Sequence, residues 1–202
     1  MKKNLYLYVI NMSTAEMPVK EQFESTVNVS DERVAHPKHW VAALVQIRSE
    51  KTVSKKLHSL GIANYVPVQS EIHKWSDRRK KVDRVVIPMI VFIHAEMEEI
   101  KKLVYHSFIH KLLTYPGQKT PAIIPDDQIE NLKFMLGQSD SRVEIRDHVF
   151  KTGDRVRIIH GPLKGIEGEL CRVETGKPML SVQIDCLGYA CVDVEVGEVE
   201  RV

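Results

Sequence analysis

Residues 153–170 read Gly-Asp-Arg-Val-Arg-Ile-Ile-His-Gly-Pro-Leu-Lys-Gly-Ile-Glu-Gly-Glu-Leu. Two short runs with β-branched residues flank a turn that contains Gly161, Pro162 and Gly165, which is the pattern of a β-hairpin. Two further β-rich runs follow, at 179–185 and 189–194. The spacing predicts a small β-barrel over 151–202. A unit of this size buries little surface and should be only modestly stable alone.

The chain that precedes this barrel has a different pattern. Residues 40–47, Trp-Val-Ala-Ala-Leu-Val-Gln-Ile, form an apolar run of strand length. Helical spacing follows in Val53, Leu57 and Leu60, and Gly61 stands where a left-handed cap would end the helix. The expected strands are 40–47, 63–72, 85–94 and 110–115, and the expected helices begin near Ser49, Glu96 and Asp127. The order β-α-β-β-α-β-α predicts an α+β fold: an antiparallel four-stranded sheet with helices packed on it.

Charge supports a division of the chain into separate units. Residues 1–36 carry four basic and five acidic side chains, net −1; residues 37–138 carry sixteen and ten, net +6; residues 139–202 carry nine and twelve, net −3. We expect an N-terminal extension over 1–36, a first domain over 37–138, a polar linker over 139–150 and the small barrel over 151–202. A basic domain and an acidic one are suited to different partners.

Composition excludes several classes of protein. The 202 residues are 43% hydrophobic and 28% charged, which indicates real cores rather than a disordered chain. No apolar run approaches the ~18 residues of a membrane span, and the run after Lys2 and Lys3 is too short for a signal peptide. We therefore expect a cytoplasmic, monomeric protein without a membrane partner. The three cysteines lack CxxC spacing, which speaks against a zinc site or a disulfide framework.

No catalytic or cofactor motif stands out. His106 and His110 have metal-ligand spacing only on a helix, and no Glu adjoins His106 as in HExxH. The glycines of 161–168 lack the GK[ST] of a phosphate loop and lead into a strand. The sequence predicts a protein that is not an enzyme and binds no metal or cofactor.

The motifs resemble those of a known family. Residues 153–170 resemble the KOW motif, which lies on an SH3-like barrel. Upstream, Trp40, Tyr65-Val66-Pro67, residues 87–93 and Leu113-Thr114-Tyr115-Pro116-Gly117 resemble the NGN domain. An NGN domain joined to a KOW domain is the arrangement of the NusG family of transcription elongation factors, and the resemblance covers about 37–202.

The resemblance also shows departures. The family pattern Phe-Pro-Gly-Tyr-Val is Ile87-Pro88-Met89-Ile90-Val91 here. Together with the N-terminal extension, this is similar to the specialised paralogues UpxY and RfaH. The resemblance implies an operon-specific antiterminator of the polysaccharide type. The alternatives are a general NusG-type factor that recruits Rho and a ribosome- or RNA-associated KOW protein.

The resemblance implies an RNA polymerase site on the NGN sheet, docking on the clamp helices of the largest subunit. The candidate polymerase-binding residues are Tyr65, Pro67, Ile90, Phe92 and Tyr115. The alternative is that they are plain core residues, since about half the side chains of a strand face its covering helices. An exposed apolar cluster would favour docking.

The segment 74–84 is a candidate nucleic-acid contact. Its basic residues are Lys74, Arg78, Arg79, Lys80, Lys81 and Arg84, beside Trp75. Such residues neutralise phosphates and stack on bases, and the alternative is a solvated hairpin tip. The family places this domain near DNA, so upstream or non-template DNA is the expected ligand.

The barrel would hold the second partner. The resemblance implies that apolar residues at the first KOW loop and before the last strand contact ribosomal protein or Rho. The matching positions are Leu163, Ile166 and Leu187, where the general factor commonly has aromatic residues.

Overall fold

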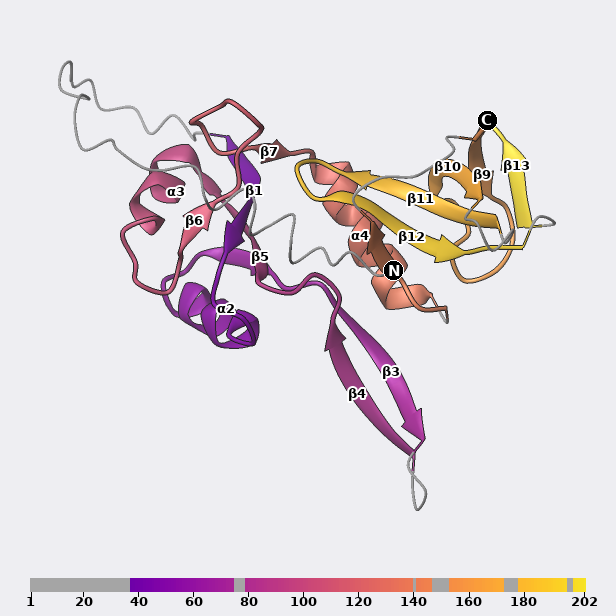
Figure 1. Cartoon of the computed structure of the whole chain (residues 1–202), viewed down its shortest axis with the longest axis horizontal. Helices are drawn as coiled ribbons and strands as arrows, with labels where there is room; N and C mark the ends of the chain where they lie inside the picture. Colours follow the sequence, from indigo (N-terminus) through magenta and orange to yellow (C-terminus); the bar gives the residue numbers. More distant parts are fainter. Residues whose placement is uncertain (1–36, 75–78, 140, 147–152, 173–177, 196–197) are drawn as a thin grey trace. The chain divides into compact units, whose positions relative to one another are not determined.

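The computed structural model describes residues 37–74, 79–139, 141–146, 153–172, 178–195 and 198–202. Within it, Lys38–Val202 form one compact unit. Helices are few and every strand pairing is antiparallel, in a five-stranded sheet, a six-stranded sheet and a separate two-stranded ribbon (Figure 1). The predicted α+β class is confirmed, with an NGN-type domain followed by a β-rich C-terminal part.

The five-stranded sheet is built around one long strand pair. β1 (Lys38–Leu44) pairs with β5 (Ile90–Glu96) over its whole length, from Lys38 opposite Glu96 to Leu44 opposite Ile90. β2 (Ala63–Tyr65) pairs with β5, while β6 (Lys111–Leu112) and β7 (Ile123–Ile124) both pair with β1. Nearly every residue of β1 and β5 is buried, because helices cover both faces of the sheet.

Two helices close one face of this sheet. α2 (Glu50–Ser59) buries Val53 and Leu57, and α3 (Met97–Leu103) buries Ile100 and Leu103. These side chains join Val41, Ala43, Val91 and Ile93 of the strands in one core cluster. Gly61 has a φ of 75°, so it takes the left-handed conformation that was predicted for the end of the first helix.

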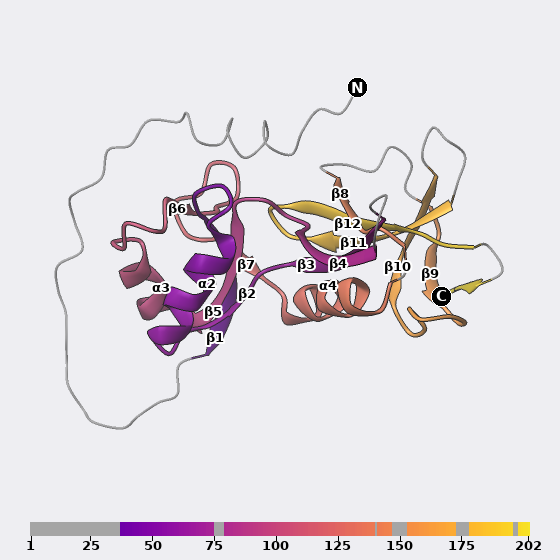
Figure 2. The ribbon, with the colours of Figure 1, turned by 90° about the horizontal axis from the view of Figure 1, so that it is seen from below.

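The third helix lies on the opposite face. α4 (Asp126–Gln138) buries Ile129, Leu132, Met135 and Leu136 and also runs alongside a strand of the six-stranded sheet (Figure 2). Asp127 and Glu130 have the spacing of a capping box, which would make Asp127 the N-cap, but α4 begins at Asp126 and has no side-chain cap. A capping box is present in α3, between Glu96 and Glu99.

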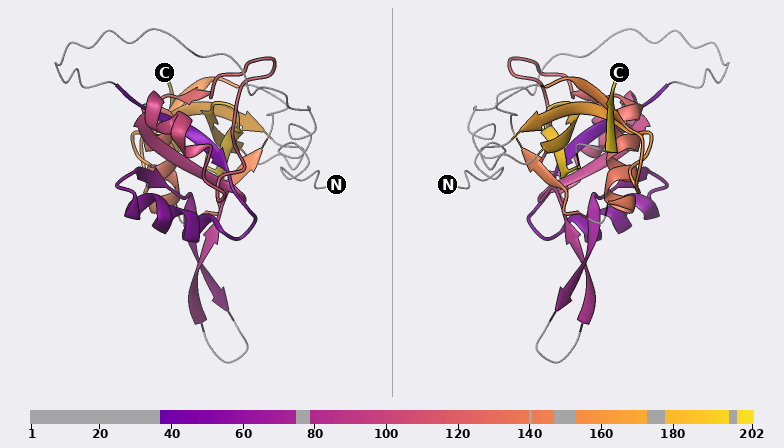
Figure 3. Two further views of the ribbon diagram at one scale, coloured as in Figure 1. Left: turned by 90° about the vertical axis from the view of Figure 1, so that its left-hand side faces the viewer. Right: turned by 90° about the vertical axis from the view of Figure 1, so that its right-hand side faces the viewer.

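The two-stranded ribbon consists of β3 (Val68–Lys74) and β4 (Arg79–Val85), paired from Val68 opposite Val85 to Lys74 opposite Arg79. It extends away from the five-stranded sheet (Figure 3). The sequence predicted single strands over 63–72 and 85–94. Each is divided in two, because the chain turns at 66–67 and at 86–89, where the Val86 N–H donates to the Pro67 carbonyl (2.8 Å).

A buried carboxylate holds the second of these turns. Met89 has a φ of 65° and Arg48 a φ of 63°, both in the left-handed region that disfavours side chains. The N–H of Met89 donates to Glu50 Oε1 at 2.7 Å, and the N–H of Arg48 donates to the same oxygen at 3.3 Å. Glu50 is 4% exposed. The position where the family pattern has Gly therefore keeps the glycine-like conformation with a Met.

The six-stranded sheet has the order β13-β9-β10-β11-β12-β8. Its strands are β8 (Glu144–Arg146), β9 (Arg155–Ile158), β10 (Glu167–Arg172), β11 (Pro178–Ile184), β12 (Gly188–Asp193) and β13 (Val199–Arg201). β8 lies inside the segment that the sequence assigned to a linker, where it pairs with β12. A Cβ on Gly168 would lie 2.5 Å from the Ser181 carbonyl oxygen, so this glycine permits the close pairing of β10 and β11.

Candidate functional site

An aromatic cluster lies on the α4 face of the five-stranded sheet. The rings of Trp40 and His94, which are cross-strand partners, stack with centroids 4.6 Å apart. The rings of Tyr65 and Phe92, partners on the next strand pair, stack at 6.2 Å. Three adjacent strands thus bring four rings to one face, where cross-strand pairs stabilise the sheet.

Lys133 of α4 completes this cluster. Its Nζ lies 4.6 Å from the centroid of Trp40 and 5.3 Å from that of Tyr65, both within cation–π range. Trp40 is buried, whereas Lys133 is exposed. Burial raises the pKa of the Tyr65 hydroxyl to about 12. The outer part of the cluster is therefore a cation held over aromatic faces, rather than a bare apolar patch.

The five candidate polymerase-binding residues occupy different environments. Ile90 and Phe92 are fully buried and Pro67 is buried, so these three have the plain core environment that was the alternative. Tyr65 and Tyr115 are partly exposed. The expected exposed apolar cluster of all five residues is therefore absent from the described part of the chain, because α4 covers that face of the sheet.

Tyr115 contacts the turn between β11 and β12. Its hydroxyl donates to Asp185 Oδ2 at 2.7 Å. Gln128 of α4 binds the same residue twice: its Nε2–H donates to Asp185 Oδ1 at 3.0 Å, and its Oε1 accepts the Asp185 N–H at 2.7 Å. The hydrogen bond to Asp185, and to a lesser extent burial, raises the pKa of the Tyr115 hydroxyl to about 12.

The candidate nucleic-acid residues follow the ribbon. Arg78 lies outside the described residues, as do the side chains of Lys74 and Arg79. Lys80 and Lys81 of β4 are exposed, and successive strand residues point to opposite faces. Lys51 of α2 forms an ion pair with Asp83 at 3.6 Å. Two groups hold the pKa of the Asp83 carboxyl below its usual value: the hydrogen bond with the Ser70 hydroxyl has the larger effect, and the charge of the Lys51 ammonium has the smaller one.

Arg84 is engaged at the base of the ribbon. Its guanidinium donates to the Glu71 carboxylate, to Gln69 Oε1 (3.1 Å) and to the Val143 carbonyl (3.0 Å). Gln69 is itself buried, accepts the Val143 N–H at 3.0 Å and donates to the Ser141 carbonyl at 2.8 Å. Arg84 and Gln69 thus fix the segment that follows α4 to the ribbon.

The three candidate partner-binding residues of the C-terminal sheet are buried: Leu163, Ile166 and Leu187. These three side chains therefore form no exposed apolar patch in the described part of the chain. Leu163 nevertheless reaches the wall of a pocket. Among the described residues, no group of three or more His, Cys, Asp or Glu side chains could hold a metal ion.

Sequence reasoning missed Lys133, Gln69 and Asp185. Lys133 could have been found, since it lies four residues after the inward-facing Ile129 and so at the edge of the apolar face of its helix. Gln69 and Asp185 make contacts with residues far away in the chain. No local pattern marks such contacts.

The described chain thus combines an α+β part that carries a basic ribbon with a small antiparallel six-stranded sheet. The first of these parts resembles a known family. Residues 38–133 match the family described as "Transcription termination factor nusG". No helix in the described part of the chain is long and apolar enough to cross a membrane.

The chain is also similar to individual proteins of known name. The transcription termination/antitermination protein NusG of Staphylococcus carnosus (strain TM300) is 23% identical over 164 residues, 75% of this chain and 87% of that protein. The protein of the same name from Staphylococcus aureus (strain Mu50) is 31% identical over 86 residues, 42% of this chain and 45% of that protein. A solved structure described as "Domain interaction in Thermotoga maritima NusG" covers 82% of this chain and 97% of its own, with 21% identity and a TM-score of 0.46.

Proposed function

We propose that the chain is a transcription elongation and antitermination factor. Its first module binds RNA polymerase, and its C-terminal module recruits a second partner. The family match over 38–133 carries this proposal, because it covers the module to which the polymerase site is assigned. A tether between the modules then raises the local concentration of the second partner at the polymerase.

The proposed polymerase surface is centred on Tyr65 and Lys133. Both are accessible at the aromatic cluster, whereas Ile90 and Phe92 support it from beneath. Aromatic and long cationic side chains combine apolar area with a polar end, which suits a protein interface. The clamp helices of the largest polymerase subunit are the proposed target. Tyr115 becomes accessible to the same partner when its hydrogen bond to Asp185 is broken.

The proposed nucleic-acid contact is the ribbon. Lys80 and Lys81 are exposed on a two-stranded arm that extends from the sheet, so both can approach phosphates. Lys51 is partly neutralised by Asp83, and Arg84 is held at the base of the ribbon. Upstream or non-template DNA is the proposed ligand, contacted by the tip half of β4.

Within the family, we assign the chain to the operon-specific antiterminators of the polysaccharide type. The support is the departure at 87–91, where a left-handed Met89 held by Glu50 replaces the glycine of the family pattern. The general factor that recruits Rho is the other candidate, since the relatives found are transcription termination/antitermination proteins named NusG. Co-precipitation separates them: Rho bound strongly by the full chain would contradict the operon-specific assignment.

The polymerase surface is tested by pulldown of RNA polymerase with the full chain. Lys133→Glu reverses the charge over Trp40 and Tyr65, so we expect retention of polymerase to fall at least fivefold. Lys119→Glu makes the same charge change at an exposed position away from the cluster and should retain polymerase. Equal retention by both variants would contradict the proposed surface, and no retention by the unaltered chain would contradict the function itself.

The ribbon is tested with duplex and single-stranded DNA over a range of salt concentrations. Each lysine that releases a counterion lowers the slope of log K against log salt by about 1 when it is removed. Lys80→Ala/Lys81→Ala should therefore lower the slope by about 2. Lys101→Ala/Lys102→Ala on α3 removes the same charge elsewhere and serves as the matched control. A slope that falls equally in both variants would show diffuse attraction and no ribbon site.

A further inference from the structure

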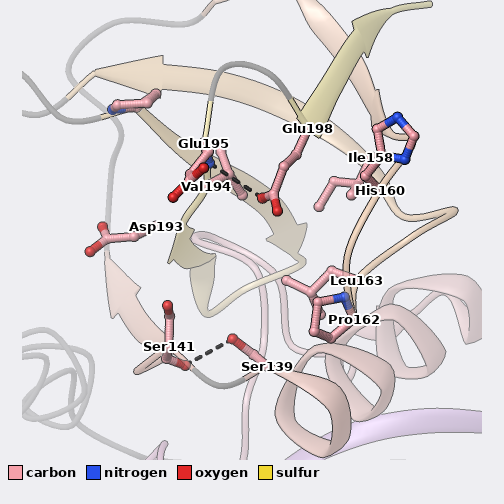
Figure 4. Close-up of a pocket in the computed structure, with 11 residues that line it drawn as sticks. Ser139, Ser141, Ile158, His160, Pro162, Leu163, Asp193, Val194, Glu195 and Glu198 are labelled. Carbon is pink, nitrogen blue, oxygen red and sulfur yellow. Dashed lines mark hydrogen bonds between the residues drawn. The ribbon is translucent and has the colours of Figure 1, made fainter.

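A pocket of about 440 Å3 opens beside the loop that joins β9 to β10. Apolar side chains form part of its lining: Ile158, Pro162, Leu163, Pro178 and Val194. Figure 4 shows Leu163 and Pro162 on one side and the segment that follows β12 on the other. Ser139 and Ser141, from the end of α4 onward, line a further edge.

Backbone geometry keeps this pocket open. Gly161 has a φ of 82°, so the loop turns sharply before Leu163. The Ile159 N–H donates to the Glu198 carbonyl at 2.8 Å, which ties the loop to the start of β13. A Cβ on Gly161 would lie 3.1 Å from Glu198 Oε1, so a glycine leaves room for that carboxylate at the pocket wall.

Three carboxylates stand around the pocket: Asp193, Glu195 and Glu198. Glu198 Oε2 accepts the Glu195 N–H at 3.5 Å, which holds two of the three acids together. None of the three forms an ion pair within the described part of the chain, whereas Glu167 and Asp154 of the same sheet are both paired with arginines. The pocket is thus lined by apolar side chains, by His160 and by three carboxylates that have no ion-pair partner in the described part of the chain.

We propose that this pocket binds a short basic segment of a partner protein, with one apolar side chain entering over Leu163 and flanking Lys or Arg side chains meeting the three carboxylates. The proposal rests on the proposed function and names the chemistry of the partner that the C-terminal module recruits. Residues 139–202 carry a net charge of −3, which would steer a basic partner toward this module. The same carboxylates repel phosphates, so a nucleic acid does not fit this site.

The test measures fluorescence anisotropy of a labelled synthetic peptide added to the full chain. The probe has one phenylalanine between two pairs of arginines. We expect binding that weakens as salt rises, because exposed charges carry part of it. A peptide with glutamates in place of the arginines should not bind. A peptide with serine in place of the phenylalanine should bind at least fivefold more weakly.

Two variants locate the binding on the molecule. Asp193→Asn/Glu195→Gln removes two charges at the pocket and should weaken binding of the basic peptide about fivefold. Glu98→Gln/Glu130→Gln removes two exposed charges on α3 and α4 and should leave it unchanged. Equal weakening in both pairs, or binding of the acidic peptide, would overturn the proposal. An unchanged affinity in the first pair, with an unchanged unfolding midpoint, would overturn it as well.

A polymerase pulldown distinguishes this proposal from the proposed function on which it rests. The Asp193→Asn/Glu195→Gln chain should retain RNA polymerase as the unaltered chain does, because the first module is untouched. Loss of polymerase in this variant would overturn the assignment of the pocket to a second partner. If the unaltered chain bound the peptide but no polymerase, the peptide site would be supported and the proposed function would be contradicted.

Discussion

The molecule contains two antiparallel strand pairs of equal length and opposite surroundings. β1 and β5 are paired over seven residues each, and so are β3 and β4. The first pair lies between helices and buries Val41, Ile90 and Phe92 completely, whereas the second carries exposed Lys80, Lys81 and Asp83. The same pattern of backbone hydrogen bonds therefore occurs in the buried pair β1–β5 and in the exposed ribbon β3–β4. Burial of apolar side chains accounts for the difference in stability, since the backbone hydrogen bonds contribute little net stability.

The largest expected effect is in the core pair. Phe92→Ala removes a completely buried ring and should lower the free energy of unfolding by about 3–5 kcal/mol. Val82→Ala on the ribbon, where the side chain is 38% exposed, should lower it by less than about 1 kcal/mol. Urea denaturation followed by far-ultraviolet circular dichroism measures both. Equal losses would mean that the ribbon is as much a part of the core as β5.

The next effect concerns the turn that separates ribbon from core. Glu50→Ala leaves the Met89 N–H without its acceptor and should cost about 1–3 kcal/mol of unfolding free energy. Met89→Gly should recover stability, by about 1 kcal/mol, because glycine adopts the positive φ without strain. Thermal unfolding of the two variants measures these opposite shifts. Destabilisation by Met89→Gly would show that the methionine side chain contributes more to the stability than its left-handed backbone conformation costs.

A smaller effect is expected at the base of the ribbon. Arg84→Ala removes the guanidinium contacts to Gln69 and to the Val143 carbonyl and should cost about 1 kcal/mol. Lys80→Ala, at the exposed end of the same strand, should cost almost nothing. Amide hydrogen exchange locates the change: the Val143 N–H should exchange faster in the first variant only. Unchanged protection there would mean that Arg84 does not fix this segment.

The smallest effect appears only at alkaline pH. The pKa of Tyr115 is raised to about 12 from 10.0, so the neutral phenol is favoured in the folded protein. The stability that this hydrogen bond contributes is therefore fully present below pH 10 and is lost as the pH rises toward 12. Ultraviolet absorbance of tyrosinate should show Tyr115 titrating late, and earlier in Asp185→Asn. Tyr65 is an internal control, because its raised pKa comes from burial. An unchanged titration in Asp185→Asn would contradict the contact.

Local patterns in the sequence predicted the strands and helices whose positions depend on burying apolar side chains. The buried strand after Trp40, the helix with Val53 and Leu57 and the left-handed Gly61 follow from periodicity and backbone sterics. The divisions at 66–67 and 86–89 did not follow, because apolar residues continue through both turns. The second turn is held by Glu50, which is far away in the sequence and accepts the Met89 N–H. β8 was missed because a polar strand at an edge resembles a linker.

The candidate site was predicted in part, for a related reason. Aromatic and apolar residues of a strand can face either a helix or solvent, and only tertiary packing decides between these. Phe92 and Tyr65 are adjacent on the sheet, yet one is fully buried and the other is partly exposed. Leu163, Ile166 and Leu187 were expected to contact a partner because of the resemblance, and all three are buried. Polar contacts between residues far apart in the chain, such as Gln69 with Val143, cannot be predicted from the sequence around either residue.

Residues 141–146 tie the six-stranded sheet to the foot of the ribbon, because Gln69 and Arg84 bind Ser141 and Val143 while β8 pairs with β12. Eight residues, 147–154, connect β8 to β9, and a chain of that length spans at most about 28 Å. Release of Val143 and β8 would leave sixteen residues between Gln138 and β9 and extend that span to about 55 Å. A few hydrogen bonds at the foot of the ribbon thus limit how far the six-stranded sheet can move away from the ribbon.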